Sequence, residues 1–309
     1  MRIVFMGTPE FAMTILAGIL TSKKHEVLAV VTQPDKPQGR KGVLTPSPVK
    51  EFALAQGLKV YQPQKVKSDE FMLVLQDLAP DVIVVAAYGQ ILNEAILTLP
   101  KYGCINVHGS LLPKYRGAAP VQYAVWNGDK ESGVTVMQMD KGMDTGAMLS
   151  KAVVPISDDM TGGELMDALA VAGSDALVKM LDSLAEGSAK PEPQNEAEAT
   201  YTHLIKREME ALDWQDCAVQ LHNKIRAFNP EPGTYTHLPN GKMLKVWRSK
   251  VVEGSGEAGT VVNADKKGLI VACGVGALQI LELQPEGKKK MDAKVFLNGG
   301  GLKVGDKLL

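Results

Sequence analysis

An amide and an imidazole stand two residues apart at the end of one short apolar segment, Cys104–His108. Apolar and polar side chains alternate there, and this period of two predicts a strand with Asn106 and His108 on one face. Pro113 follows shortly and ends the strand. A strand that delivers Asn and His to the carboxyl edge of an open sheet suits a chemical site. The pattern also fits a core histidine with a hydrogen-bonded neighbour.

A carboxylate is the third candidate for chemistry. Asp144 lies in the segment 140–146, between Gly142 and Gly146, directly after a predicted strand at 134–139. From a tight loop of this kind a carboxylate could reach a histidine on a neighbouring strand. An Asp beside Gly is also a common turn former, so the position alone does not decide between the two readings.

The elements that must position these side chains alternate between strands and helices. Apolar runs indicate strands, and amphipathic periodicity indicates helices, of which 161–184 is the longest. This alternation favours an α/β fold with a doubly wound, mostly parallel, Rossmann-like sheet. The predicted strands are 3–6, 27–31, 60–61, 82–86, 104–108, 134–139 and 148–155.

The second half of the chain has a different pattern. Residues 189–199 are polar, contain proline and lack large apolar side chains, so we place a linker at 189–206. Beyond a short helix at 214–226, brief strand candidates are separated by Gly, Asn and Asp turns, which favours a small OB-like β-barrel. The expected domains are therefore 1–188 and 207–309, joined by this linker.

Composition narrows the class of protein. With 309 residues, 45% of them hydrophobic and 22% charged, the chain can bury a sizeable core. Three widely spaced cysteines favour a reducing, cytoplasmic setting. No stretch reaches the ~20 apolar residues that span a bilayer. Residues 7–9 are Gly-Thr-Pro where a dinucleotide fold carries Gly-x-Gly-x-x-Gly, so a nicotinamide cofactor is disfavoured; no metal-ligand spacing is present.

Basic residues collect in the long segment 33–50 and in the second half of the chain. The net charge of −1 divides into −4 for residues 1–206 and +3 for residues 207–309, which permits a polyanionic partner. A basic loop of this length at the rim of a polar site would suit a phosphate-bearing substrate. A solvated surface is the simpler explanation for such charges.

Several blocks in the same order resemble the folate-dependent formyltransferase family, and within it most closely the enzymes that formylate methionyl-tRNA. The central block is Asn106-x-His108 with the Ser-Leu-Leu-Pro segment at 110–113, followed by Arg-Gly-Ala-Ala-Pro at 116–120 and Met-Asp-Thr-Gly at 143–146. The other blocks are Gly-Thr-Pro-Glu-Phe-Ala at 7–12, Gln-Pro-Asp at 33–35, Pro-Ser-Pro-Val-Lys at 46–50, Ala-Tyr-Gly at 87–89, Ile-Arg-Ala-Phe-Asn-Pro at 225–230 and Gly-Lys-Lys at 287–289.

The resemblance implies an activity, in which a formyl group moves from 10-formyltetrahydrofolate to the α-amino group of methionine on initiator tRNA, for translation initiation. The donor is a co-substrate, and no metal is implied. Amine attack on a formamide carbon develops negative charge on oxygen, which preorganised donors stabilise. Asn106 and a protonated His108 are such donors, and Asp144 would orient His108 and relay protons through water.

The resemblance also implies binding residues. Part of the loop after the Asn-His strand would seat the folate, and a cis Leu112–Pro113 bond is a plausible way to shape it. The implied folate contacts are Ser110, Leu111, Leu112 and Pro113. The implied tRNA contacts are Lys36, Arg40, Lys41, Arg226, Lys288 and Lys289.

Two other activities would keep the same Asn, His and Asp. They are hydrolysis of 10-formyltetrahydrofolate and N-formylation of a sugar nucleotide, and the long basic loop argues for tRNA over both. A glycinamide ribonucleotide formyltransferase would lack residues beyond roughly 200, so the second domain disfavours it. We expect a monomer that binds tRNA and folate and no membrane.

Overall fold

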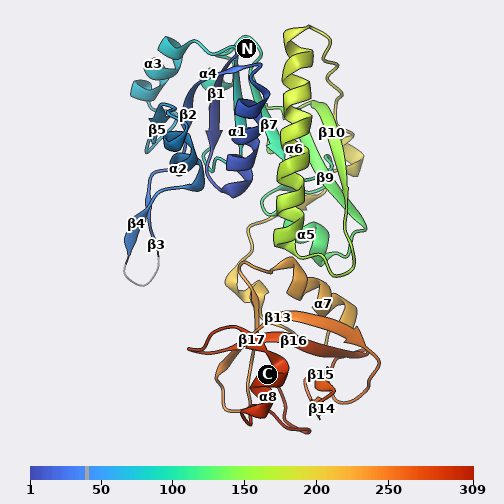
Figure 1. Cartoon of the computed structure of the whole chain (residues 1–309). Coiled ribbons are helices and arrows are strands. Elements are labelled where there is room, and N and C mark those ends of the chain that lie inside the picture. The colour runs from blue at the N-terminus through green and yellow to red at the C-terminus, as the bar shows by residue number, and fades with distance from the viewer. Residues whose placement is uncertain (39–41) are drawn as a thin grey trace. The chain divides into compact units, whose positions relative to one another are not determined.

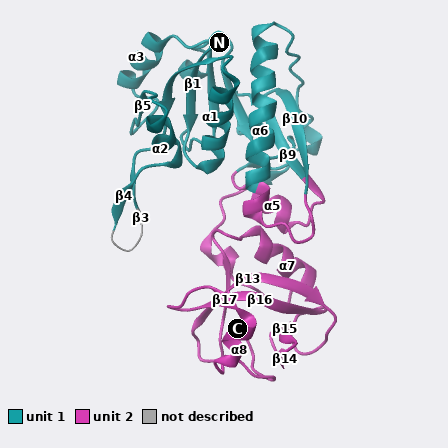
Figure 2. Cartoon of the chain, in the orientation of Figure 1, with its two compact units in different colours: residues 1–117, 132–155, 166–201 teal, residues 118–131, 156–165, 202–309 magenta. Residues whose placement is uncertain are grey.

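The computed structural model describes residues 1–38 and 42–309 (Figure 1). The chain forms two compact units (Figure 2). Unit 1 consists of Met1–Gly117, Ser132–Pro155 and Met166–Tyr201. Unit 2 consists of Ala118–Glu131, Ile156–Leu165 and Thr202–Leu309. Two segments from within the expected first domain, 1–188, therefore pack with the carboxyl-terminal unit.

Unit 1 is built on a seven-stranded sheet with the order β10-β9-β7-β6-β1-β2-β5. The pairs from β7 through β6, β1 and β2 to β5 are parallel, and β9 pairs antiparallel with β7. This confirms the doubly wound, mostly parallel sheet. Its strands are β1 (Arg2–Gly7), β2 (Glu26–Val31), β5 (Val60–Tyr61), β6 (Val82–Ala86), β7 (Cys104–His108), β9 (Glu131–Gln138) and β10 (Met148–Pro155).

Helices cover both faces of this sheet, which is why β6 is buried along its whole length. On one face α1 and α6 lie together: a Cβ on Gly18 of α1 would clash with Ser174 Oγ of α6, so glycine allows this approach without moving the serine side chain. On the other face Phe71 and Leu75 of α3 and Ile96 of α4 join an apolar cluster with side chains from β1, β6 and β7. The helices are α1 (Glu10–Ser22), α2 (Pro48–Ala55), α3 (Asp69–Leu78), α4 (Glu94–Leu97) and α6 (Gly162–Ala185).

The carboxyl edge of the sheet has its switch point between β1 and β6, where successive connections leave in opposite directions. The loops meet there through hydrogen bonds from side chains to one backbone carbonyl. Thr8 Oγ1 donates to the Tyr88 carbonyl at 2.9 Å, and Gln33 Nε2 donates to the same oxygen at 3.2 Å. Burial in the apolar cluster raises the pKa of Tyr88 to about 12. The edge is thus a rigid, polar rim beside the end of β7.

The basic segment after β2 contains elements that the sequence analysis did not predict. A short antiparallel hairpin joins β3 (Lys36–Gln38) to β4 (Val43–Thr45), and α2 follows with the Ser47 side chain accepting a hydrogen bond from the Lys50 amide. Lys50 also pairs with Asp35 at 2.7 Å. Arg40 and Lys41 lie outside the described residues.

Unit 2 contains an antiparallel sheet with the order β12-β13-β16-β15-β14, and β17 pairs with β16. The pairing of β13 with β16 shifts register beside Trp247, and such bulges bend strands around a core. This confirms the small barrel-like domain. Its strands are β12 (Thr234–His237), β13 (Met243–Val252), β14 (Val261–Asp265), β15 (Gly268–Ala272), β16 (Ala277–Pro285) and β17 (Met291–Asp292).

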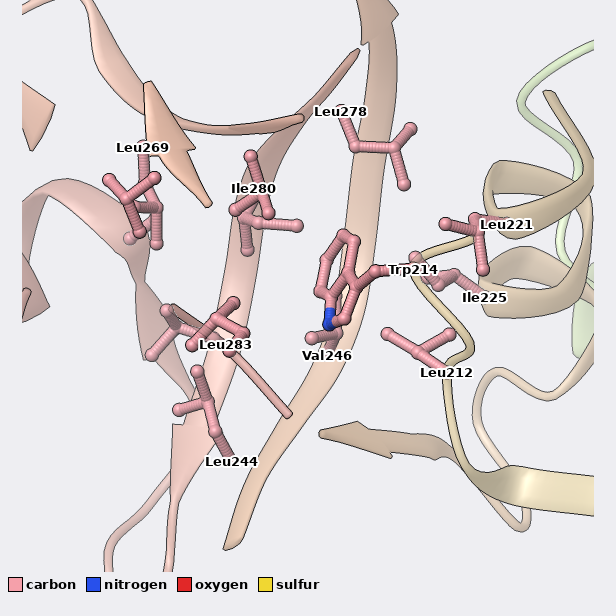
Figure 3. Packing of buried hydrophobic residues seen from close by; sticks show 14 of the residues in the cluster. Leu212, Trp214, Leu221, Ile225, Leu244, Val246, Leu269, Leu278, Ile280 and Leu283 are labelled. Carbon is pink, nitrogen blue, oxygen red and sulfur yellow. The ribbon is translucent and has the colours of Figure 1, made fainter. Parts of the chain in front are cut away.

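The core of unit 2 lies between the sheet and the helices α7 (Ala218–Ala227) and α8 (Ala293–Asn298). Leu221 and Ile225 on one face of α7 meet Trp214 and strand side chains such as Val246 (Figure 3). The Trp214 indole donates to Thr236 Oγ1 at 2.9 Å, so the ring is buried with its polar atom satisfied. Apolar burial holds α7 on the sheet, and the Trp214 bond fixes the segment before α7 to β12.

Helix α5 (Pro120–Trp126) packs against α7 within unit 2. The rings of Trp126 and Phe228 meet edge to face at 5.2 Å. Arg226 is 6% exposed, and its guanidinium donates to the carbonyls of Ser157 and Met160. These contacts explain why 118–131 and 156–165 belong to this unit.

Among the described residues, no helix combines the length and apolar character needed to cross a membrane.

The stability of unit 2 should depend on the protonation of His222. Burial lowers the pKa of His222, outweighing the carbonyl of Asp158 and the carboxylate of Asp159, which raise it, while Arg226 lowers it further. A neutral imidazole thus favours the folded state, and the free energy of unfolding should fall as pH drops below about 6.5, where the unfolded chain takes up a proton. In the His222→Asn variant, the free energy of unfolding should fall less steeply between pH 7.5 and 5.5 than in the unmodified protein. Urea denaturation at several pH values measures this slope.

Burial also lowers the pKa of His25 in unit 1. His25 is present in the unmodified protein and in His222→Asn, so the effect of His222 is the difference between their slopes of unfolding free energy against pH. Parallel pH dependence in the two proteins would show that His222 does not contribute.

Candidate active site

The site is built at the carboxyl end of β7. Asn106 faces Val85 of β6 on one side and Met137 of β9 on the other, and His108 pairs with Thr135. His108 is 7% exposed and Asn106 is half-buried. Their alternation along the strand places both side chains on the same face, as the sequence predicted.

Both ring nitrogens of His108 face oxygen atoms. Nε2 lies 2.9 Å from the carbonyl oxygen of Tyr115, a hydrogen-bond distance. Nδ1 lies 3.6 Å from Oδ2 of Asp144, which is close enough for electrostatic attraction but too long for a hydrogen bond. Nδ1 is therefore the ring nitrogen that is not committed to a backbone hydrogen bond with Tyr115.

Asp144 is held by the backbone on either side of it. Its Oδ2 accepts a hydrogen bond from the Gly117 amide at 2.8 Å. Its own φ is +55°, a left-handed conformation that Asp tolerates better than most residues. Two residues later, a Cβ on Gly146 would lie 1.7 Å from the Gln138 carbonyl oxygen, so the loop turns back tightly on β9. The carboxylate is thus carried by a constrained loop, as a site group requires.

The loop after β7 is fastened to β9 by one hydroxyl. Thr135 Oγ1 accepts from the Leu112 amide at 3.0 Å and donates to the Ser110 carbonyl at 2.7 Å. Ser110 Oγ donates to the Lys114 carbonyl at 2.6 Å. The Leu112–Pro113 bond is cis, as the resemblance led us to expect.

A buried arginine next to this loop anchors the segment that the sequence analysis assigned to the linker. Arg116 has no exposed surface, and its two terminal nitrogens donate to both carboxylate oxygens of Glu196 at 2.7 and 2.8 Å. Its Nε donates to Gln194 Oε1 at 3.0 Å. Hydrogen bonds that Arg116 donates to Glu196 and to the Tyr201 hydroxyl oxygen raise the pKa of Arg116, and the same ion pair lowers the pKa of Glu196. The linker up to residue 201 is therefore part of unit 1.

Known proteins match both units. The pattern of the family described as "Formyl transferase" covers residues 1–181, and "Formyl transferase, C-terminal domain" covers residues 204–301. The methionyl-tRNA formyltransferase of Caldanaerobacter subterraneus subsp. tengcongensis is 52% identical over 308 residues, spanning 99% of both chains. The chain belongs to the methionyl-tRNA formyltransferase family. The Bacillus subtilis member is 48% identical, over 99% of this chain and 97% of its own.

Solved structures with lower identity show the fold of this formyltransferase. HypX from Aquifex aeolicus, in complex with tetrahydrofolic acid, superposes with a TM-score of 0.67 at 18% identity, over 99% of this chain and 50% of its own. The sugar 3N-formyltransferase WlaRD superposes with a TM-score of 0.66 at 21% identity, over 94% of this chain and 99% of its own. The family uses folate-derived formyl donors.

The tRNA contacts predicted for this formyltransferase differ in their surroundings. Lys36, Lys288 and Lys289 are exposed. Lys290, next to them, lies over the Trp247 ring with Nζ 3.9 Å from its centroid. Arg226 is buried and donates to backbone carbonyls, so little of its side chain remains for an RNA phosphate.

The sequence analysis missed the residues that hold the site in place. Thr135, Arg116 and Gln194 form their contacts with partners 23 to 85 residues away, so no local pattern reveals them. Arg116 lies in a matched family block, which is the one signal that could have singled it out. Within residues 1–38 and 42–309, no group of three or more His, Cys, Asp or Glu side chains could hold a metal ion.

Thr135→Val should loosen the loop at 110–113. Valine has a similar shape but leaves the buried Leu112 amide and Ser110 carbonyl without this partner, at a cost of about 1–3 kcal/mol in unfolding free energy. Denaturant unfolding measures the loss, and Thr98→Val, which removes an exposed helix hydroxyl, serves as the control. Equal stability of the two variants would mean that Thr135 does not hold the loop.

Proposed function

We propose that this protein transfers the formyl group of 10-formyltetrahydrofolate to the α-amino group of methionine on initiator tRNA. The observation that carries the proposal is full-length similarity, at 48–52% identity, to methionyl-tRNA formyltransferases across both units. The grouping of Asn106, His108 and Asp144 at one sheet edge supports it chemically.

The reaction requires groups that stabilise a tetrahedral intermediate. The methionyl nitrogen attacks the formyl carbon, the carbonyl oxygen becomes negative, and the bond from that carbon to the folate nitrogen then breaks. Donors aimed at the developing negative charge lower the barrier. The Asn106 amide and a protonated His108 are the two donors on the β7 face, and both stand at the open carboxyl edge.

The contacts of His108 assign different tasks to its nitrogens. Nε2 is committed to the Tyr115 carbonyl, which fixes the ring orientation. Nδ1 therefore faces the reacting atoms, with Asp144 at 3.6 Å from it. Because this distance is too long for a hydrogen bond, Nδ1 is available to the substrate oxygen or to a water. Asp144 holds negative charge beside the ring. After the attack it accepts, through water, the proton released by the methionyl ammonium. That proton then passes to the departing folate nitrogen.

The loop at 110–113 would seat the folate donor. Thr135 bonds the Leu112 amide and the Ser110 carbonyl, so these backbone groups are already ordered before the ligand arrives. Ser110, Leu111, Leu112 and Pro113 are the contacts we propose, with Leu111 the half-buried member. The open end of β7 beside this loop is where the formyl group would sit.

Unit 2 and the basic hairpin would hold the tRNA. Lys288 and Lys289 are exposed on the loop between β16 and β17, and Lys36 is exposed at the start of the hairpin; phosphate contacts of this kind position RNA without reading its sequence. We retain Arg40 and Lys41 in the proposal and remove Arg226, which binds backbone carbonyls instead. We place the tRNA-binding domain at 207–309 and expect a monomeric protein acting in the cytoplasm.

A formyl-transfer assay tests the function. We expect transfer from 10-formyltetrahydrofolate to methionine-charged initiator tRNA, and little transfer to elongator tRNA, free methionine or an amino-sugar nucleotide. Donor hydrolysis without tRNA preference would assign the protein to the hydrolases, and transfer to the sugar nucleotide would assign it to the sugar formyltransferases.

In the same assay, Asp144→Asn should leave the fold intact and lower kcat by about 10²–10⁴-fold, because only the charge and the proton acceptor are lost. Asp140→Asn is the control, since Asp140 caps the same loop through Gly142 and Thr145 without contacting His108. Turnover of Asp144→Asn close to that of the unmodified protein would remove Asp144 from the mechanism.

Substitution of Lys288 and Lys289 should affect tRNA binding and not the chemical step. The double variant Lys288→Gln, Lys289→Gln should raise KM for the tRNA at constant kcat. The slope of log binding constant against log salt concentration should become shallower by about one to two, roughly one for each lost phosphate contact. Lys23→Gln, exposed at the amino edge of the unit 1 sheet, is the control. An unchanged KM in the double variant would leave Lys288 and Lys289 as solvated surface residues.

A further inference from the structure

The Gln194 side chain spans the gap between the buried arginine and the loop that carries Asp144. Its Nε2 donates two hydrogen bonds, to the Asp144 carbonyl at 2.7 Å and to the Gly146 carbonyl at 2.8 Å. Its Oε1 accepts from Arg116 Nε at 3.0 Å. The NH₂ group of Gln194 thus donates both of its protons to carbonyls two residues apart in one loop, and the amide oxygen accepts a hydrogen bond from a guanidinium.

Arg116 determines which way this amide points. A guanidinium only donates, so the Gln194 oxygen must face Arg116 and the NH₂ group must face the loop. Arg116 is itself fixed, because it is fully buried and both carboxylate oxygens of Glu196 pair with it. The orientation of the clamp is therefore set by the chemistry of its partners, and not only by its rotamer.

Asp144 needs such a clamp because its backbone conformation is unfavourable on its own. A residue other than glycine at φ +55° persists where the surrounding structure holds it. The Gly117 amide holds the carboxylate, and the Gln194 amide holds the main-chain carbonyl of the same residue. Gly117 follows Arg116 directly, so one short segment supports Asp144 both through its own backbone and through Gln194.

We propose that Gln194 is a positioning residue for Asp144, with Arg116 as its anchor. Through the two carbonyls it fixes the conformation of the 144–146 loop and thereby the place of the carboxylate beside His108. Gln194 touches no reacting atom and acts only through Asp144. The proposal rests on the proposed function, since it assumes that Asp144 takes part in formyl transfer.

The position of Gln194 in the chain gives this contact a second consequence. Gln194 and Glu196 belong to the segment that leads into the matched carboxyl-terminal domain at 204–301. The segment is bound to unit 1 by Arg116 on one side and by the Met148–Glu192 bridge on the other. The segment that joins the domains is therefore also a structural part of the catalytic site.

Two substitutions of Gln194 separate positioning from packing. Gln194→Met keeps the volume and removes every polar contact, whereas Gln194→Glu keeps an acceptor for Arg116 but turns an oxygen, in place of the NH₂ group, toward the two carbonyls. Each should lower kcat by about 10- to 100-fold with KM for the tRNA unchanged, because a small displacement of a catalytic group affects the chemical step. Glu198→Gln is the control, since Glu198 is exposed in the same segment and bonds only Asn195.

A double-mutant cycle distinguishes this role from a structural one. In an Asp144→Asn background, Gln194→Glu should cause no further loss of kcat, because the group it positions is already gone. Equal losses in both backgrounds would show that Gln194 acts independently of Asp144 and would overturn the proposal, as would unchanged kcat in both single variants. If the unmodified protein transfers no formyl group to tRNA, the proposed function fails first, and the two failures are distinct.

Discussion

A guanidinium with no exposed surface must be paired, and one distant segment supplies partners to Arg116. Glu196 takes both terminal nitrogens, and Gln194 takes Nε. Because an unpaired buried charge is strongly destabilising, the segment at 194–196 must stay against unit 1 for the loop at 116–117 to keep its place. The Gly117 amide, and with it one support of Asp144, depends on that ion pair.

The remaining geometry follows from the way the sheet changes direction. Parallel strands bring their carboxyl ends to one edge, and β7 is the last parallel strand before β9 runs antiparallel beside it. His108 thus ends a strand exactly where the antiparallel neighbour begins to supply side chains such as Thr135. The reversal allows one hydroxyl to bond both Ser110 and Leu112 and to fix the loop next to the imidazole.

The sequence predicted the elements whose side chains follow a regular period over enough residues. The buried run of β6, the alternation of β7 and the long amphipathic helix α6 were all placed within a few residues of their observed bounds. Helix α5 was missed because it has seven residues and begins after Ala119, whose left-handed backbone has no signature in a single residue.

The candidate site divides in the same way. Asn106 and His108 were paired by strand geometry. The loop position of Asp144 left two readings open, a site carboxylate or a turn former, and the resemblance favoured the first. Gln194 and Arg116 support the site through contacts with residues 48 or more positions away in the sequence. A single polar side chain in a polar segment has no periodicity from which such contacts could be predicted. Arg226 was expected to contact tRNA through the resemblance, and no local signal indicated that its guanidinium donates to backbone carbonyls.

The composition of unit 2 from three separated stretches has a consequence during synthesis. Helix α5 leaves the ribosome long before α7, yet the Trp126 ring is packed against Phe228 only when the later stretch has emerged. In the interval, the apolar side of α5 has no native neighbour from α7, and the nascent chain carries an uncovered indole. The native contacts of α5 can therefore form only after Phe228 has left the ribosome.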